Sequence, residues 1–203
     1  MDPKRLSFLE DLKTRSEAEN VPNISRLNAK FIHFLARMKQ AKNVLEIGTA
    51  NGYSTIWLAD AVEPFGGHVT SIDLSTPAHN AAVKNVQDAE ISNVTLIHAN
   101  AKDVMQNLYE KKIQNTPPDK GEGGFNLIFI DARKGDYPIF WELAKPLLAE
   151  DGLVIIDDVI KFPEKTQAFH EHMATETEYE QVIIPVDGDD GVMLVQQKTG
   201  IRS

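Results

Sequence analysis

Short apolar runs rich in Val, Ile and Leu alternate along the chain with longer segments whose apolar residues recur at helical spacing. The short runs predict buried strands, and the longer segments predict amphipathic helices. The predicted strands cover residues 43–47, 68–72, 94–98, 125–130, 153–156, 181–184 and 192–196. The predicted helices cover residues 6–18, 25–38, 54–61, 77–89, 102–111, 137–148 and 163–174. This alternation is typical of an α/β fold with a mostly parallel sheet.

The ends and connections of these segments set the expected topology. The predicted helix at residues 25–38 places Phe31, Leu35 and Met38 on one face at helical spacing. The last two predicted strands are joined by the short turn sequence PVDGDDG, so an antiparallel hairpin is expected there. Residues 114–124, QNTPPDKGEGG, predict a surface loop and not a domain boundary, so residues 1–203 are expected to form a single domain.

Composition narrows the class of protein. Apolar residues make up 42% and charged residues 25% of the chain, as in a soluble globular protein. The charged N-terminus and the lack of a long apolar run predict neither a secretory signal nor a membrane span. The chain contains no cysteine, which excludes disulfides, thiolate metal sites and a cysteine nucleophile, and agrees with a cytoplasmic location. Its net charge of −9 makes nucleic acid an unlikely partner, because nucleic-acid binders are usually basic.

A glycine-containing turn follows the first predicted strand. In Glu46-Ile47-Gly48-Thr49-Ala50-Asn51-Gly52 the two glycines permit a tight turn and a close approach of a ligand, and the next helix offers free N–H groups. Ala50 stands where a dinucleotide motif has the glycine that admits a pyrophosphate, so a nucleoside without phosphates fits better. Asp73 ends the second strand 21 residues after Gly52 (73 − 52), where an acid binds ribose hydroxyls in nucleoside-binding folds. The alternative is a turn without a ligand.

Acidic residues follow two later strands. Asp131 comes directly after residues 125–130, and Asp157 and Asp158 come directly after residues 153–156. The carboxyl ends of parallel strands line one crevice, so these acids are expected to converge there. Three carboxylates that close repel one another unless a cation lies between them, and all-oxygen ligands suit Mg²⁺, Mn²⁺ or Ca²⁺. Spacing alone leaves open the alternative of solvated acids that cap the next helix. The six histidines show no metal-ligand spacing.

The sequence NVLEIGTANGYSTIWLA, followed by VTSIDLS, resembles the first two motifs of class I S-adenosylmethionine (SAM) methyltransferases. The Gly-Tyr-Ser after the turn is similar to the caffeoyl-CoA and catechol O-methyltransferase family. The resemblance continues through FNLIFIDARKGDYPIFWELAKPLL, GLVIIDDV and PVDGDDGVMLV, and covers the chain from Ile24 to Val195. It implies a Rossmann-like methyltransferase fold with a seven-stranded, mostly parallel sheet, an antiparallel C-terminal strand and helices on both faces. Residues 41–203 would form the Rossmann-like core. Two extra helices within residues 1–40 would cover the cofactor and substrate site.

The resemblance also implies a set of cofactor contacts. Ile24 matches an apolar position that packs on the methionine part of SAM, and Glu46 matches the acid near its amino group. Asn100 and Ala101 match an Asp-Ala pair that faces the adenine. Together with the turn and Asp73, the full predicted cofactor set is Ile24, Glu46, Gly48, Thr49, Gly52, Ser54, Asp73, Asn100, Ala101 and Asp131. Without a cofactor, Ile24 would be a helix staple and Asn100 a helix cap.

Asp131, Asp157 and Asp158 match the three metal ligands of that family, although Asp158 stands where the family usually has Asn. Ile160-Lys161-Phe162 replaces the usual Trp and Gly, so the substrate region differs from that of relatives. Lys134 matches the general base of the catechol-type enzymes. A cation beside a lysine lowers the pKa of that lysine, which can then accept the proton of a hydroxyl whose own pKa is ~10. The alternative is a solvated lysine beside Asp131 and Asp136.

The sequence therefore predicts a SAM-dependent O-methyltransferase that uses a divalent cation, Mg²⁺ being favoured, to modify a small molecule with adjacent hydroxyls. Three alternatives remain open at this point: a tRNA hydroxyuridine methyltransferase, a nicotinamide-dependent oxidoreductase and a cofactor-binding protein without catalysis. A homodimer is also left open.

Overall fold

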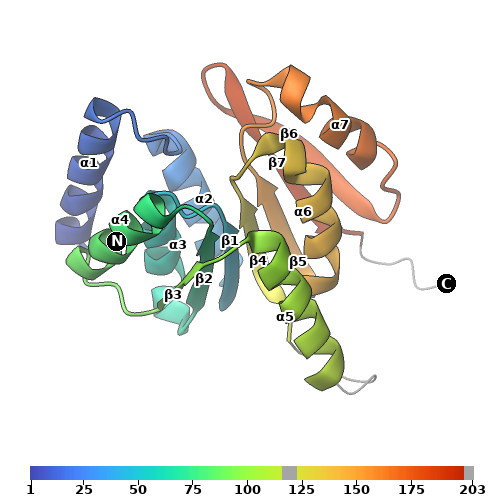
Figure 1. The fold of residues 1–203 in the computed structure, drawn as a ribbon, viewed down its shortest axis with the longest axis horizontal. Helices are drawn as coiled ribbons and strands as arrows, with labels where there is room; N and C mark the ends of the chain where they lie inside the picture. Colours follow the sequence, from blue (N-terminus) through green and yellow to red (C-terminus); the bar gives the residue numbers. More distant parts are fainter. Residues whose placement is uncertain (116–122, 199–203) are drawn as a thin grey trace. The chain divides into compact units, whose positions relative to one another are not determined.

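The computed structural model of this chain describes residues 1–115 and 123–198. These residues fall into two compact units, Met1–Ala101 and Lys102–Ser203, each of which is described by itself (Figure 1). Most of the predicted loop at residues 114–124 lies outside the described residues, and its first two residues continue a helix. Among the described residues, no helix is both long enough and apolar enough to cross a bilayer.

The first unit contains three parallel strands in the order β3-β2-β1. Its strands are β1 (Asn43–Ile47), β2 (His68–Asp73) and β3 (Val94–His98). Its helices are α1 (Pro3–Ala18), α2 (Arg26–Met38), α3 (Tyr53–Val62) and α4 (Thr76–Asp88), with a 3₁₀ turn at Glu63–Phe65. Each predicted element is present, and the bounds differ from the predicted ones by three residues or fewer.

Local capping sets where two of these helices begin. The Ser25 hydroxyl accepts the N–H of Asn28 at 3.0 Å, so Ser25 is the cap of α2 and not its first residue. The Ser75 hydroxyl accepts the N–H of Ala78 at 3.4 Å and caps α4 in the same way. Pro77 in the first turn of α4 loses nothing, because its missing N–H would have had no partner inside the helix.

Helix α3 is the centre of the first unit, because every one of its residues is buried. Asp60 on this helix accepts bonds from Arg5 of α1 at 2.6 Å and from His33 of α2 at 2.8 Å. Burial raises the pKa of Asp60, but His33 and Arg5 outweigh burial and hold this pKa below its usual range. The network ties both N-terminal helices to α3.

The core face of α2 differs from the predicted face. Ala29, Ile32, Leu35 and Ala36 are buried, whereas Met38 is 66% exposed. Of Phe31, Leu35 and Met38, which share one face, only Leu35 is therefore buried. The buried positions follow the i, i+3, i+4 spacing that starts at Ala29, and Met38 falls outside that stripe.

The second unit contains four strands in the order β4-β5-β7-β6. Its strands are β4 (Phe125–Ile130), β5 (Leu148–Ile156), β6 (Tyr179–Asp187) and β7 (Asp190–Gln197). Its helices are α5 (Ala101–Asn115), α6 (Tyr137–Ala144) and α7 (Pro163–Met173), with 3₁₀ turns at Lys134–Asp136 and Lys145–Leu147. β4 and β5 are parallel, and β7 is antiparallel to both of its neighbours, as the predicted hairpin and antiparallel C-terminal strand require (Figure 1).

Two of the boundaries that differ from the prediction in this unit are those of α6 and β5. The predicted helix at residues 137–148 ends at Ala144, because Pro146 cannot continue an α-helix. β5 begins at Leu148, five residues before the predicted start at residue 153. Gly152 lies inside β5, where an added Cβ would meet the Leu148 side chain at 2.6 Å.

Candidate active site

The turn after β1 has the backbone conformation that its glycines permit. Gly48, Ala50 and Gly52 all have positive φ, at 98°, 46° and 87°. A Cβ on Gly52 would lie 3.3 Å from the Ala82 Cα, so glycine is needed there both for conformation and for the close packing of α4. The N–H of Gly48 donates to the Ile72 carbonyl at 3.0 Å and anchors the turn to the end of β2.

Asp73 lies directly against this turn. One of its oxygens accepts the N–H of Ala50 at 2.9 Å, and the other accepts the N–H of Ser75 at 2.8 Å. The Asp73 carbonyl accepts the N–H of Ala99 at 3.0 Å. Asn100, the next residue, therefore follows β3 at the same end of the sheet at which Asp73 ends β2. The structure thus brings together three segments that the sequence analysis assigned to the cofactor.

A cavity of about 580 Å³ opens beside the turn and Asp73. This volume is in the range of small-molecule sites. Leu12, Val21 and Pro22 give it an apolar wall from the N-terminal segment, and Pro77 and Ala81 give it another from α4. Of the predicted cofactor residues, Asp73 lines it; the others lie elsewhere in the described part of the chain.

The remaining predicted residues on this turn are buried beneath it. Glu46 is fully buried, and its carboxylate accepts the hydroxyls of Ser71, at 2.6 Å, and Thr55. The Thr49 hydroxyl bonds the same Ser71 hydroxyl at 2.6 Å. Sequence reasoning missed Ser71 and Thr55, whose signal was polarity inside segments that are otherwise apolar. Ser54 and Ile24 are buried too, and Ile24 directly precedes the cap of α2.

The three predicted acids of the second unit converge. Asp131, Asp157 and Asp158 offer ligand atoms that all lie within 4.8 Å of one another. Asp157 is 4% exposed, and its N–H donates to the Ile130 carbonyl at 2.9 Å, which holds the end of β5 against the end of β4. Asp158 has a φ of 52°, a left-handed conformation that Asp adopts more readily than most residues.

Lys134 lies between these acids. Its ammonium is 3.2 Å from an oxygen of Asp131 and 2.5 Å from an oxygen of Asp158. Burial lowers the pKa of Lys134, but the two carboxylates outweigh burial and raise it above its usual value. The depressed pKa that the sequence analysis expects presumes a cation beside Lys134, whereas the side chains that lie beside it here are carboxylates, which raise its pKa.

Electrostatics in this cluster disfavours a full set of negative charges. Burial raises the pKa of Asp157 well above its usual range, and the charges of Asp131 and Asp158 add to that effect. Burial and a hydrogen bond to Asp190 raise the pKa of Asp158 to about 6. A divalent cation relieves such repulsion, so these oxygens are a suitable ligand set for a hard ion.

Sequence reasoning missed two neighbours of the acids. The buried Tyr137 hydroxyl donates to the Asp157 carbonyl at 2.9 Å, and the Lys134 ammonium lies 5.9 Å from the centre of the Tyr137 ring. Asp190 comes from the turn-rich PVDGDDG segment, which we interpreted only as a hairpin turn. No spacing rule links residue 190 to residue 158, so this contact is visible only in the fold.

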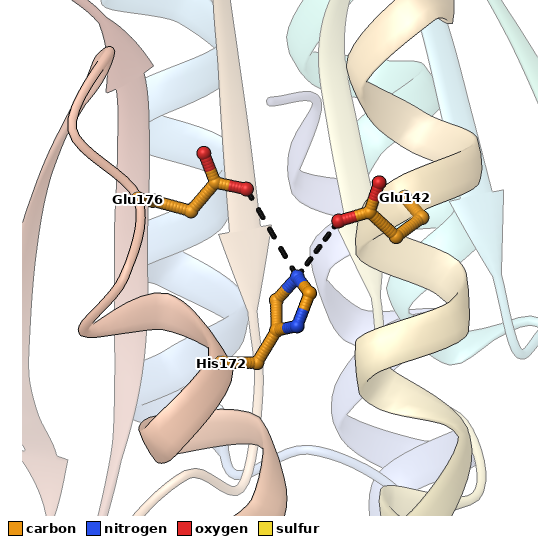
Figure 2. Close-up of side chains that lie close together, drawn as sticks. All are labelled: Glu142, His172 and Glu176. Carbon is orange, nitrogen blue, oxygen red and sulfur yellow. Dashed lines mark hydrogen bonds and ion pairs between the residues drawn. The ribbon is translucent and has the colours of Figure 1, made fainter.

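A second group of possible ligands lies between α6 and α7. Figure 2 shows Nε2 of His172 directed at two carboxylates, 2.7 Å from Glu142 and 4.0 Å from Glu176. Lys145 already bridges both carboxylates, at 2.8 and 2.7 Å, and the Trp141 indole N–H donates to Glu176 at 2.8 Å. The Lys145 ammonium and the Trp141 N–H therefore already bind these carboxylates. We therefore interpret this group as a polar link between two helices.

Comparison with known proteins identifies the family of this chain. A model of the O-methyltransferase family matches residues 3–198. The chain belongs to the O-methyltransferase family. It is 37% identical over 141 residues to a catechol O-methyltransferase of Niastella koreensis, covering 68% of this chain and 59% of that protein. It is 34% identical over 148 residues to a catechol O-methyltransferase of Mycobacterium tuberculosis, covering 72% of this chain and 62% of that protein. The chain thus spans about three fifths of the length of these curated relatives.

Solved structures of O-methyltransferases share the fold. One from Bacillus cereus in complex with SAH is 28% identical, with a TM-score of 0.79 over 94% of this chain and 91% of that one. TomG from Streptomyces achromogenes, in complex with SAM, is 26% identical, with a TM-score of 0.78 over 97% of this chain and 90% of that one. The predicted Rossmann-like α/β fold class and the family resemblance are both confirmed.

Proposed function

We propose that this protein is a SAM-dependent O-methyltransferase that uses a divalent cation to methylate a small molecule with adjacent hydroxyls. The observation that carries the proposal is the convergence of Asp131, Asp157 and Asp158 around the Lys134 ammonium. Family membership supplies the reaction class, and the acids supply the reason for a cation. Residues 1–203 would act as one catalytic domain.

SAM supplies a methyl group on a positively charged sulfur. In the proposal, the carboxylate of Asp73 binds the ribose hydroxyls at the turn, and the segment that starts at Asn100 and Ala101 borders the adenine. Ile24 and Ser54, with Glu46 and the turn residues Gly48, Thr49 and Gly52, shape the methionine end. The bonds from Ala50 and Ser75 to Asp73 support this role, because they hold the carboxylate in place before a ligand arrives.

The cation would be held by Asp131, Asp157 and Asp158, with Mg²⁺ favoured and Mn²⁺ or Ca²⁺ as the other candidates. A divalent cation lowers the pKa of a hydroxyl that it contacts and orients that hydroxyl. The burial of Asp157 fits a cation ligand, because burial disfavours an ionised carboxylate and a nearby cation favours it.

Lys134 is the proposed general base. The hydroxyl oxygen of the substrate forms a bond to the methyl carbon, the bond from sulfur to that carbon breaks, and the hydroxyl proton passes to Nζ of Lys134. Nζ can accept this proton only in its neutral form. Asp131 and Asp158 now stabilise the charged form, so they would first have to bind the cation in place of the ammonium. This requirement links the base to the cation site through Asp131 and Asp158.

For the substrate, we propose a class of molecule and not a particular compound. The catechol O-methyltransferases among the relatives favour a catechol-like molecule, and the acidic net charge favours a small molecule over nucleic acid. The cysteine-free composition suits a cytoplasmic enzyme.

The test is methyl transfer from labelled SAM to catechol by protein stripped of metal with EDTA and dialysed. We expect no transfer until Mg²⁺ is added, and no transfer in Asp131→Asn with Mg²⁺ present. Asp189→Asn is the matched control, because Asp189 is 77% exposed and is expected to leave the rate unchanged. Full activity of the stripped protein would reject the cation, and a complete lack of transfer to a panel of vicinal diols and phenols would reject the reaction.

A further inference from the structure

Buried hydrogen bonds connect the turn after β1 to the helices α1 and α4. Nδ2 of Asn51 donates to the Ser16 hydroxyl of α1 at 2.8 Å, and the Asn51 carbonyl accepts from Nδ2 of Asn85 of α4 at 2.9 Å. Ser16, Asn51 and Asn85 are each at most 7% exposed, and all three line the cavity beside Asp73. Asn51 is therefore the residue at which the turn is bonded to both helices.

The direction of these bonds shows what the Asn51 amide contributes. The Ser16 hydroxyl donates its one proton to the Leu12 carbonyl at 2.7 Å, so toward Asn51 it can only accept. An amide can donate this bond, whereas an ionised carboxylate or an aliphatic side chain cannot. Oδ1 of Asn51 is buried and has no hydrogen-bond partner among the described residues. The side chain of Asn51 therefore holds α1 through its bond to Ser16.

Helix α1 supplies part of the cavity wall. Leu12 and Ser16 of this helix line the cavity, as does Val21 in the connection that follows it. The N–H of Val21 donates to the Ser16 carbonyl at 2.9 Å, so this connection is held to the end of α1. Another part of the lining is the turn, whose Ala50 N–H donates to the Asp73 carboxylate at 2.9 Å. A ligand bound at Asp73 has this complete wall only while α1 is docked on the turn.

We propose that Asn51 is a positioning residue for the cofactor, whose amide holds α1 in the docked position that SAM binding requires. This inference rests on the proposed function, because it presumes that SAM binds at Asp73 and the turn. The affinity for SAM then falls in proportion to the fraction of molecules in which α1 is docked. By linkage, bound SAM favours the docked position of α1.

The test is the dissociation constant for SAH, the product that SAM becomes after methyl transfer, measured by isothermal titration calorimetry on the whole chain. Asn51→Ala removes the amide, and we expect about tenfold weaker binding, as when the docked fraction falls to about one tenth. Ser16→Ala removes the acceptor and is expected to give the same loss. It leaves the turn unchanged, so it tests the same contact should Asn51→Ala fail to fold. The double variant is expected to bind as each single variant does, because both substitutions remove one contact.

Asn93→Ala is the matched control. Nδ2 of Asn93 also donates to main-chain carbonyls, those of Ala59 at 3.0 Å and Gly67 at 2.9 Å. Asn93 directly precedes β3, at the end of the strands opposite to the turn. Asn93→Ala is therefore expected to lose stability and to bind SAH as the unmodified protein does.

Hydrogen–deuterium exchange separates positioning from general stability. Without SAH, the amides near the end of α1 are expected to exchange faster in Asn51→Ala than in the unmodified protein, and saturating SAH is expected to slow them. SAH affinity that is unchanged in Asn51→Ala or falls equally in Asn93→Ala would overturn the role of Asn51 and leave the proposed function intact. Losses that multiply in the double variant, or α1 amides of Asn51→Ala that exchange alike with and without SAH, would do the same. Failure of the unmodified protein to bind SAH would overturn the cofactor assignment, and the role of Asn51 with it.

Discussion

Replacing Asp158 by Asn tests the electrostatics of the acid cluster in the protein without metal. The Asp158 carboxyl is held between Asp190, which disfavours its ionised form, and Lys134, which favours it. Burial and Asp190 prevail, and the pKa of Asp158 rises from 3.8 to about 6. Asparagine has nearly the same shape and no ionisable proton, so this substitution removes the charge with little change in packing.

The expected change in the free energy of unfolding follows from the pKa shift of Asp158. A change of about two pKa units corresponds to roughly 3 kcal/mol, and because the side chain is 31% exposed we discount this to about 1–2 kcal/mol for solvent screening. Below the unfolded-state pKa, both the folded and unfolded states hold the proton. As the pH rises from about 4 to about 6, the unfolded chain releases the proton first, so the folded protein loses stability. Asp158→Asn lacks this loss.

The assay is urea unfolding followed by circular dichroism in EDTA, at intervals from pH 4.5 to pH 7.5. We expect the stability of Asp158→Asn relative to the unmodified protein to increase as the pH rises to about 6 and to stay about 1–2 kcal/mol higher above that pH. Asp189→Asn is the control and is expected to show no such trend, because Asp189 is largely exposed. A difference between Asp158→Asn and the unmodified protein that does not change with pH would refute this reasoning.

Three further substitutions test other parts of the site. Gly52→Ala forces a Cβ into a left-handed conformation and against α4, so it is expected to cost about 1–2 kcal/mol in urea unfolding and to weaken SAM binding in calorimetry; Gly66→Ala, with open space around it, is expected to spare SAM binding. Tyr137→Phe leaves a buried carbonyl without its donor and is expected to cost about 1–3 kcal/mol, and an unchanged unfolding midpoint would contradict this. Lys134→Met is expected to lower methyl transfer at least ~100-fold with SAM affinity unchanged, whereas Lys111→Met, on the exposed surface of α5, keeps its rate; equal rates in the two variants would exclude Lys134 as the base.

The sequence predicts the fold well because its signals are local. The alternation of apolar runs and amphipathic segments depends on neighbouring residues, and every predicted strand and helix is present. Errors arise where tertiary packing or proline overrides the local pattern. Pro146 ends α6 early, and the residues from Leu148 to Gly152 join β5 although their polarity suggests a turn.

The candidate site is predictable in part for the same reason. Acids at strand ends are local signals, and Asp131, Asp157 and Asp158 do converge. The ion pairs of Lys134 follow from its position three residues after Asp131, but their effect on its pKa depends on how many carboxylates surround it. Asp190 could not be predicted, because its contact with Asp158 arises from the register of β7 beside β5, which no sequence spacing encodes.

The central claim is tested most directly by the crystal structure of the protein grown with SAH and Mn²⁺, with the ion located by its anomalous scattering. The account predicts one strong anomalous peak coordinated by Asp131, Asp157 and Asp158, and electron density for a ribose within hydrogen-bonding distance of Asp73. An ion bound elsewhere, or acids that keep Lys134 as their only cation at saturating Mn²⁺, would contradict it.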